Sequence, residues 1–239
     1  MTPLEFLNML WGAKPARLYI LIWTRDGKQS HWFPDVTAAA KFVSTHNRDT
    51  YVGVGLSDRD YGLHHRCKSE QIAGISGLWA DFDLRSDAHA KPLPATIEEA
   101  LSLIPGDIPP TIIIVTGNGV HVWWLFNQPW IFANDDERKD ASELSFRFQT
   151  FLRCKSNQRG WVFERLFDLP RLLRIPGAVA MSARQMSIKS QKSTSSRSRL
   201  YCTHFCSNPR MFAGQWVGST INPRYRFRSR RSESPVGFA

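Results

Sequence analysis

The chain has 239 residues, 42% of them hydrophobic, which is enough for one sizeable domain with a packed core or for two small ones. No run approaches the ~20 consecutive apolar residues that a membrane helix requires, and the N-terminus lacks a basic segment followed by an apolar signal core. Both absences predict a cytoplasmic protein without a membrane partner.

The formal charge of +10 indicates a polyanionic partner, but it is unevenly distributed. Residues 182–239 contain eleven Lys or Arg and one acid. Subtracting these from the chain totals of 31 and 21 leaves 20 basic and 20 acidic residues in 1–181. We therefore expect a catalytic domain over 1–181 and a basic Ser/Arg-rich tail over 182–239. The tail is expected to be largely disordered, and it either holds phosphate backbones loosely or is only solvated.

The four cysteines are too sparse for a disulfide framework, so we expect reduced thiols. Cys202, His204 and Cys206 form a CTHFC cluster that could begin a zinc site. A second pair of ligands at standard spacing is missing, which makes zinc the less favoured interpretation.

Turn residues and hydrophobic periodicity divide residues 1–181 into short helices and strands. Helices are expected over 3–12, 36–46, 96–104 and 135–155. Strands are expected over 17–24, 30–33, 51–57, 77–84, 111–116 and 120–126, with an exposed loop over 58–71. This order predicts an α+β domain with a mainly antiparallel or mixed sheet, and not a regular parallel array.

The stretch GLWADFDL, residues 77–84, places two aspartates in an apolar run. Strand alternation predicts that Asp81 and Asp83 share one face with Trp79, while the opposite face is wholly apolar. The two carboxylates are then ~7 Å apart along the strand and repel each other unless a cation or proton lies between them. This pattern indicates a metal site, although Asp-X-Asp pairs also occur in turns, calcium loops and sugar-nucleotide transferases.

The stretch TGNGVHVWW predicts a second functional element, a hairpin with a tight turn over residues 117–119. Its backbone N–H groups could cradle phosphate, with the hydroxyl of Thr116 nearby and His121 two residues past the turn. A lone strand histidine is more often a structural residue.

A third element is Asp168 in RLFDLPRLLRIPG, either a ligand or a cap or turn residue. Arg171 and Arg174 follow it, and both can grip phosphate bidentately.

The three motifs, in this order and with these gaps, resemble the archaeo-eukaryotic primase superfamily, especially the primase-polymerases of phages and plasmids. The resemblance runs from about Tyr51 to Gly177. It implies a primase-polymerase catalytic fold with an RRM-like sheet. Two departures stand out: Gly119 occupies a position that is Ser in many relatives, and Ala178 and Ala180 follow RIPG in place of Thr and Asn. The chain also gives way to its tail after the third motif, so it is expected to be truncated.

The resemblance implies a template-dependent nucleotidyltransferase, a DNA primase or polymerase that acts in the replication of a phage, plasmid or other mobile element. By this likeness Asp81, Asp83 and Asp168 hold two Mg²⁺ or Mn²⁺ ions and His121 contacts the nucleotide's phosphates. Three carboxylates supply the oxygen ligands that these ions prefer. The remaining candidate nucleotide contacts are Thr116, Gly119, Arg171 and Arg174.

The expected partners are nucleoside triphosphates, a single-stranded DNA template and a replicative helicase. Arg59, Arg66 and Lys68 of the exposed loop are candidate template contacts. One alternative is a catalytically degenerate primase-like module that binds nucleic acid chiefly through the tail. Another is a sugar-nucleotide transferase, which leaves Asp168 and the two arginines unexplained.

Overall fold

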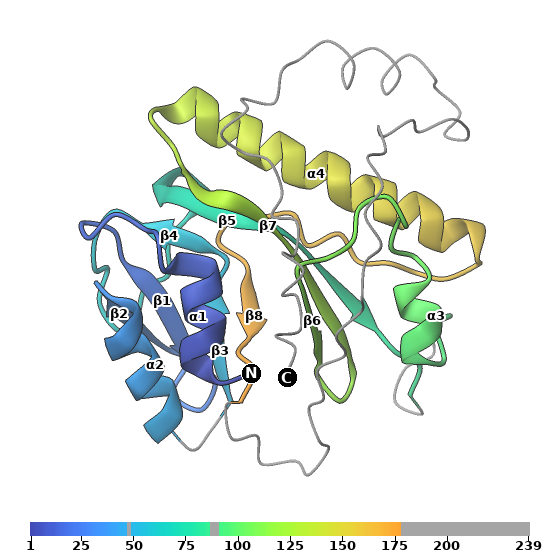
Figure 1. The fold of residues 1–239 in the computed structure, drawn as a ribbon, viewed down its shortest axis with the longest axis horizontal. Helices are drawn as coiled ribbons and strands as arrows, with labels where there is room; N and C mark the ends of the chain where they lie inside the picture. The colour runs from blue at the N-terminus through green and yellow to red at the C-terminus, as the bar shows by residue number, and fades with distance from the viewer. Residues whose placement is uncertain (47–48, 87–90, 178–239) are drawn as a thin grey trace, which may run out of the picture.

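Antiparallel sheets and helices build residues 1–46, 49–86 and 91–177, which this computed structural model describes. Within these residues there are two four-stranded sheets, and all their strand pairs are antiparallel. The predicted α+β class with antiparallel pairing is therefore confirmed, and the strands are divided between two sheets (Figure 1). The tail over 182–239, including the CTHFC cluster, lies outside the described residues, as do Ala178 and Ala180.

The first sheet has the strand order β2-β1-β3-β8. Its strands are β1 (Ile20–Thr24), β2 (Gln29–Phe33), β3 (Thr50–Gly53) and β8 (Leu172–Arg174). The helices α1 (Pro3–Trp11) and α2 (Val36–Thr45) lie beside this sheet in Figure 1. Since β8 pairs with β3, the segment that follows Asp168 completes a sheet begun at the N-terminus.

The second sheet has the strand order β4-β5-β7-β6. Its strands are β4 (Gly55–Ser57), β5 (Ile72–Asp83), β6 (Ile112–Val115) and β7 (Gly119–Ile131), and the short helix α3 (Ile97–Leu101) and the long helix α4 (Asp135–Gln158) accompany them. A single 3-10 turn, η1 (Ser69–Gln71), precedes β5. Both β5 and β7 extend beyond the predicted ranges, because the pairing continues past an irregularity between Ile75 and Gly77.

The predicted strand over 51–57 bends at Val54 and contributes to both sheets as β3 and β4. The N–H of Val54 donates to the carbonyl of Arg171 at 2.9 Å. A Cβ on Gly55 would lie 2.6 Å from Ile72 Cγ2 and 2.9 Å from the carbonyl oxygen of Leu169, so only glycine permits this close approach. The split therefore depends on residues far along the chain, which local periodicity does not reveal.

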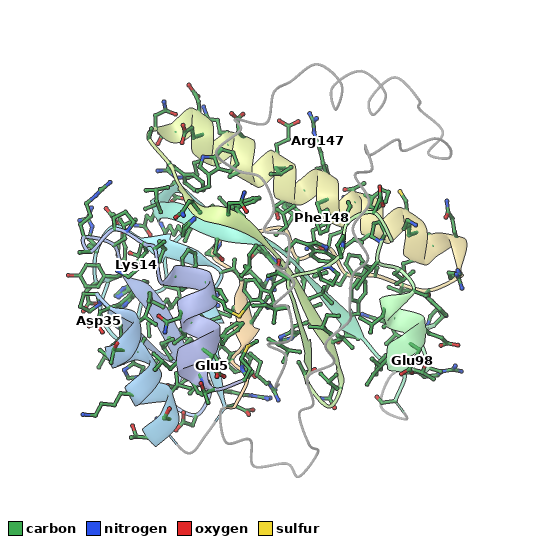
Figure 2. All side chains as sticks on the ribbon, in the orientation of Figure 1. Glu5, Lys14, Asp35, Glu98, Arg147 and Phe148 are labelled. Carbon is green, nitrogen blue, oxygen red and sulfur yellow. The ribbon has the colours of Figure 1, made fainter. Side chains whose placement is uncertain are left out.

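Both faces of the β5–β7 pair are covered by helices near its centre. Trp79 and Trp123 are directly opposite on one face and both are fully buried, with Phe6 of α1 contacting Trp123 at 5.8 Å between ring centroids. On the other face, Phe148 of α4 packs on Trp124 at 4.8 Å. Figure 2 shows Phe148 on the side of α4 that faces the sheet and Arg147 on the opposite side.

Helix starts follow the sequence signals closely. Thr2 caps α1 and forms a reciprocal capping box with Glu5, and Asn134 caps α4. The buried face of α4 includes Ala141, Phe148 and Leu152. Among the described residues, no helix has the length and apolarity needed to cross a membrane.

His31 on β2 makes the stability of the first sheet sensitive to pH. Its ring packs on Phe42 of α2 at 4.4 Å, and burial, with His46 nearby, lowers its pKa below the ordinary value of about 6.5. Between the lowered value and 6.5 the unfolded chain binds more protons than the folded chain, so folding stability rises with pH there. This contribution is present above pH ~6.5 and is lost as the pH falls through the folded-state pKa.

We therefore expect the free energy of unfolding, measured by denaturant titration, to fall between pH 7 and pH 5. His31→Phe should fall less steeply, because the titrating group is replaced by an uncharged ring. Equal slopes for the two proteins would contradict the role given to His31.

Candidate active site

Strand pairing gathers four of the predicted site residues at the hairpin end of the second sheet. Asp81 is directly opposite His121, and Asp83 is directly opposite Gly119. Side chains that are directly opposite in an antiparallel pair lie on the same face. Asp81, Asp83 and His121 therefore lie on one face, which confirms the shared face predicted for the two aspartates, and we call these three residues, together with Thr116, the Asp81 site.

The contact between Asp81 and His121 is electrostatic and partly shielded from water. Nε2 of His121 lies 3.5 Å from Oδ2 of Asp81, and the exposed fractions of the two side chains are 8% and 26%. The other ring nitrogen, Nδ1, is buried and has no hydrogen-bond partner among the described residues. A buried polar atom without a partner is costly for folding.

A tight turn joins β6 to β7 next to Asp83. The N–H of Thr116 donates to the carbonyl of Gly119 at 2.9 Å, and Gly117 has a φ of 87°, as type II′ turns require at their first central residue. Among the described residues, no hydrogen bond uses the N–H of Gly117 or Asn118. The predicted tight turn is confirmed, and it lies at the end of β7 where Gly119 is opposite Asp83.

Gly119 is required by the backbone of β5. A Cβ at this position would lie 2.3 Å from the carbonyl oxygen of Phe82 and 3.1 Å from Cα of Asp83. A serine therefore does not fit here without a shift of the strands. The structure explains why this chain departs from the resembled pattern at Gly119, and Thr116 is left as the nearby hydroxyl.

Asp168 is held by Arg171 in a local turn. Its Oδ1 accepts from Nε of Arg171 at 2.9 Å and from Nη2 at 2.5 Å, and its carbonyl accepts the N–H of Arg171 at 3.0 Å. The sequence left Asp168 as either a metal ligand or a cap or turn residue, and in the structure it is a turn residue. Its role as a ligand stays a prediction.

Arg174 lies on the first sheet and stacks on an aromatic ring. Its Cζ is 5.6 Å from the ring centroid of Tyr51, its Nη2 donates to the Tyr51 hydroxyl at 3.2 Å, and Asp49 is 3.7 Å away. In the exposed loop, Arg59 pairs with Asp58 at 3.3 Å, whereas Arg66 and Lys68 are exposed. The phosphate and template contacts assigned to these residues stay predictions.

The predicted metal ligands fit a divalent ion in part. Asp81 and Asp83 offer hard oxygen donors from one strand face, which Mg²⁺ and Mn²⁺ prefer. Among the described residues, however, no three His, Cys, Asp or Glu side chains come together as a group that could hold a metal. The pair fits, while the complete set with Asp168 is not assembled.

A small pocket at the edge of β5 adds two residues that the sequence did not single out. Lys91 and Glu164 line it together with Asp81, Asp83 and apolar side chains that include Phe163. Glu164 lies in the same run as Asp168, but only its position beside β5 distinguishes it from an ordinary surface glutamate.

Gln149 of α4 was also missed, although it holds the segment before Asp168 in place. Its Nε2 donates to the carbonyl of Trp79 at 2.5 Å, and its Oε1 accepts the N–H of Leu166 at 3.4 Å. The indole N–H of Trp79 donates to the carbonyl of Leu166 at 2.6 Å. The side chain is fully buried, so these bonds have no competition from water.

Comparison with known proteins gives one structural similarity. The chain matches no known protein-family model and no curated protein. Among solved structures, it is similar to the AEP domain of the primase-polymerase (PrimPol) of cyanophage S-2L, with 17% sequence identity and a TM-score of 0.49. The match covers 79% of this chain and 88% of that one.

Gly119→Ala should destabilise the protein by about 1–3 kcal/mol, because the added Cβ meets the backbone of β5. Gly106→Ala is the matched control, since a Cβ there has nothing within 4 Å. Denaturant unfolding measures both variants. A Gly119→Ala protein as stable as the Gly106→Ala protein would show that the strands do not pack as described.

Gln149→Leu should cost about 1–3 kcal/mol of stability, because the carbonyl of Trp79 and the N–H of Leu166 lose a buried partner. Gln149→Glu keeps an acceptor for Leu166 but loses the donor to Trp79. Thermal and denaturant unfolding compare the variants. No loss of stability in Gln149→Leu would mean that the bridge is dispensable.

Proposed function

We propose that this chain is a template-dependent nucleotidyltransferase of the primase-polymerase type, which joins nucleoside triphosphates on single-stranded DNA. The observation that carries the proposal is the register of β5 and β7, which aligns Asp81 with His121 and Asp83 with the Gly119 turn. Two carboxylates and an imidazole thereby lie on one face of the sheet, next to the hairpin turn. The replication of a phage, plasmid or other mobile element, with a helicase, is the setting that the sequence resemblance suggests.

The carboxylates of Asp81 and Asp83 are the groups that would hold Mg²⁺ or Mn²⁺. When bound, such ions activate the attacking 3′-oxygen and stabilise the pyrophosphate leaving group. Asp81 also faces the imidazole of His121, so one carboxylate both attracts the cation and orients the ring. In this proposal, the contact between Asp81 and His121 links the residue that would contact the phosphates to a residue that would hold the ions.

His121 and the hairpin amides would bind the triphosphate. A carboxylate accepts hydrogen bonds only, so a hydrogen bond from His121 to Asp81 uses the proton on Nε2. The N–H groups of Gly117 and Asn118 and the hydroxyl of Thr116 can donate to phosphate oxygens.

Asp168 joins this site in the proposal only after a rearrangement. In the structure its Oδ1 is bonded to Arg171, and it forms no metal-binding group with Asp81 and Asp83. The segment before it, residues 161–168, has no strand pairing and is fastened to β5 through Gln149 and Trp79. Asp168 would complete the ligand set for the ions only if its carboxylate left Arg171, whose guanidinium would then be available to phosphate.

A second candidate function is a primase-like module that binds nucleic acid without catalysis. The unassembled carboxylates favour it, since a degenerate site would keep the fold and lose the ligand set. It predicts nucleic-acid binding that survives the loss of all three aspartates.

Asp81→Asn should reduce primer synthesis and extension on a single-stranded DNA template by about 100-fold or more, because a ligand of the catalytic ions is lost. The measurement is product formation with Mn²⁺ or Mg²⁺ and with either ribo- or deoxynucleoside triphosphates. Asp136→Asn is the matched control, as this aspartate on α4 is 85% exposed and pairs with Lys139.

Equal product from wild type and Asp81→Asn would contradict the assignment of Asp81. A wild-type protein that makes no product but binds the template would favour the non-catalytic module. Loss of activity in Asp168→Asn with normal binding of nucleotide would support the role of Asp168 as a ligand of the ions.

A further inference from the structure

Three side chains form a continuous row across the first sheet. Trp23 of β1, Tyr51 of β3 and Arg174 of β8 are directly opposite one another, so they lie on one face. The rings of Trp23 and Tyr51 meet edge to face at 5.5 Å, and the guanidinium of Arg174 covers Tyr51 at 5.6 Å. We call these residues the aromatic row.

The aromatic row lies on the face opposite to α2. His31 and Phe33, which are paired with Ile22 and Ile20, contact Phe42 of α2 at 4.4 and 5.3 Å. Strand alternation places Trp23 on the other face. All three members of the row are partly exposed, unlike the fully buried Ile20 and Ile22.

Positive charge borders the aromatic row. Asp49 lies 3.6 Å from Arg25 and 3.7 Å from Arg174, so two guanidinium groups share one carboxylate and one positive charge is left over. The side chain of Arg25 is 67% exposed. The edge of the row can therefore receive a phosphate, and the two rings beside it are partly exposed to solvent.

We propose that the aromatic row binds single-stranded nucleic acid by stacking unpaired bases on Trp23 and Tyr51, with phosphates at Arg25 and Arg174. Partly exposed rings bordered by arginine are the chemistry of single-strand binding surfaces, and a duplex hides the base faces that stacking requires. That the bound strand is the template rests on the proposed function, whereas the binding itself does not. In this proposal the bases of the bound strand lie on the first sheet, whereas the Asp81 site lies on the second sheet.

The test is the binding of a fluorescent 16-nucleotide oligo(dT) to the full chain. Binding is measured by fluorescence anisotropy in a buffer that contains EDTA and raised salt. EDTA removes metal bridging, and salt suppresses non-specific phosphate contacts of the basic tail. Trp23→Ala and Tyr51→Ala should each raise Kd by about 5-fold to 100-fold, the loss expected for one stacked base. Tyr51→Phe keeps the ring and should bind close to wild type.

Phe146→Ala is the matched control. Phe146 on α4 is 39% exposed and lies 5.0 Å from Phe167 and 5.1 Å from the guanidinium of Arg165, so it has the same aromatic and arginine composition on another surface. Thermal unfolding checks that each variant is folded. If Trp23→Ala proves unstable, crosslinking of 4-thiothymidine DNA to the wild-type chain locates the strand instead, with adducts expected at Trp23 or Tyr51.

Unchanged binding in both alanine variants, an equal loss in Phe146→Ala, or duplex binding as tight as single-strand binding would overturn the proposal. Oligo(U) that binds like oligo(dT) supports base stacking without sugar recognition, and preference for one of them identifies the strand. If the chain makes no product but its binding depends on Trp23, the proposed function fails and the aromatic row stands. If the chain makes product but its binding does not depend on Trp23 or Tyr51, the proposal for the aromatic row fails and the proposed function stands.

Discussion

Backbone hydrogen bonds between β5 and β7 hold Asp81 opposite His121, and a slip of one residue in this pairing would turn the side chains of one strand to the opposite face. Two glycines fix the alignment. A Cβ at Gly77 would lie 2.1 Å from the carbonyl oxygen of Trp124. Near the hairpin, a Cβ at Gly119 would lie 2.3 Å from the carbonyl oxygen of Phe82. The close contact of the strands at these points makes other registers sterically unfavourable.

Burial decreases along β5 in the direction of the hairpin. Trp79 is fully buried, the side chain of Asp81 is 26% exposed, and Asp83 is exposed at the strand end. The same strand is thus anchored in the core by its indole and offers carboxylates to solvent two and four residues later. Side chains held on a rigid strand keep a more exact geometry than side chains on a loop.

Periodicity within each element predicted much of the fold and the face of Asp81, because alternation and capping depend on neighbouring residues. The start of α1 at Thr2 and the shared face of Asp81 and Asp83 are examples. The bend at Val54 could not be predicted, since it depends on a hydrogen bond to Arg171. The same is true of the alignment of Trp23 with Tyr51, which follows from sheet register and not from either strand alone.

Gln149 has a consequence for self-association. Among the described residues, β5 from Gly77 to Asp83 has a strand partner only in β7, so its other edge presents backbone groups that could pair with a second chain. The amide of Gln149 occupies the carbonyl of Trp79 in the middle of this edge, and the indole of Trp79 fastens Leu166 across it. One side chain thereby protects the strand that carries the carboxylates from intermolecular β-pairing and aggregation.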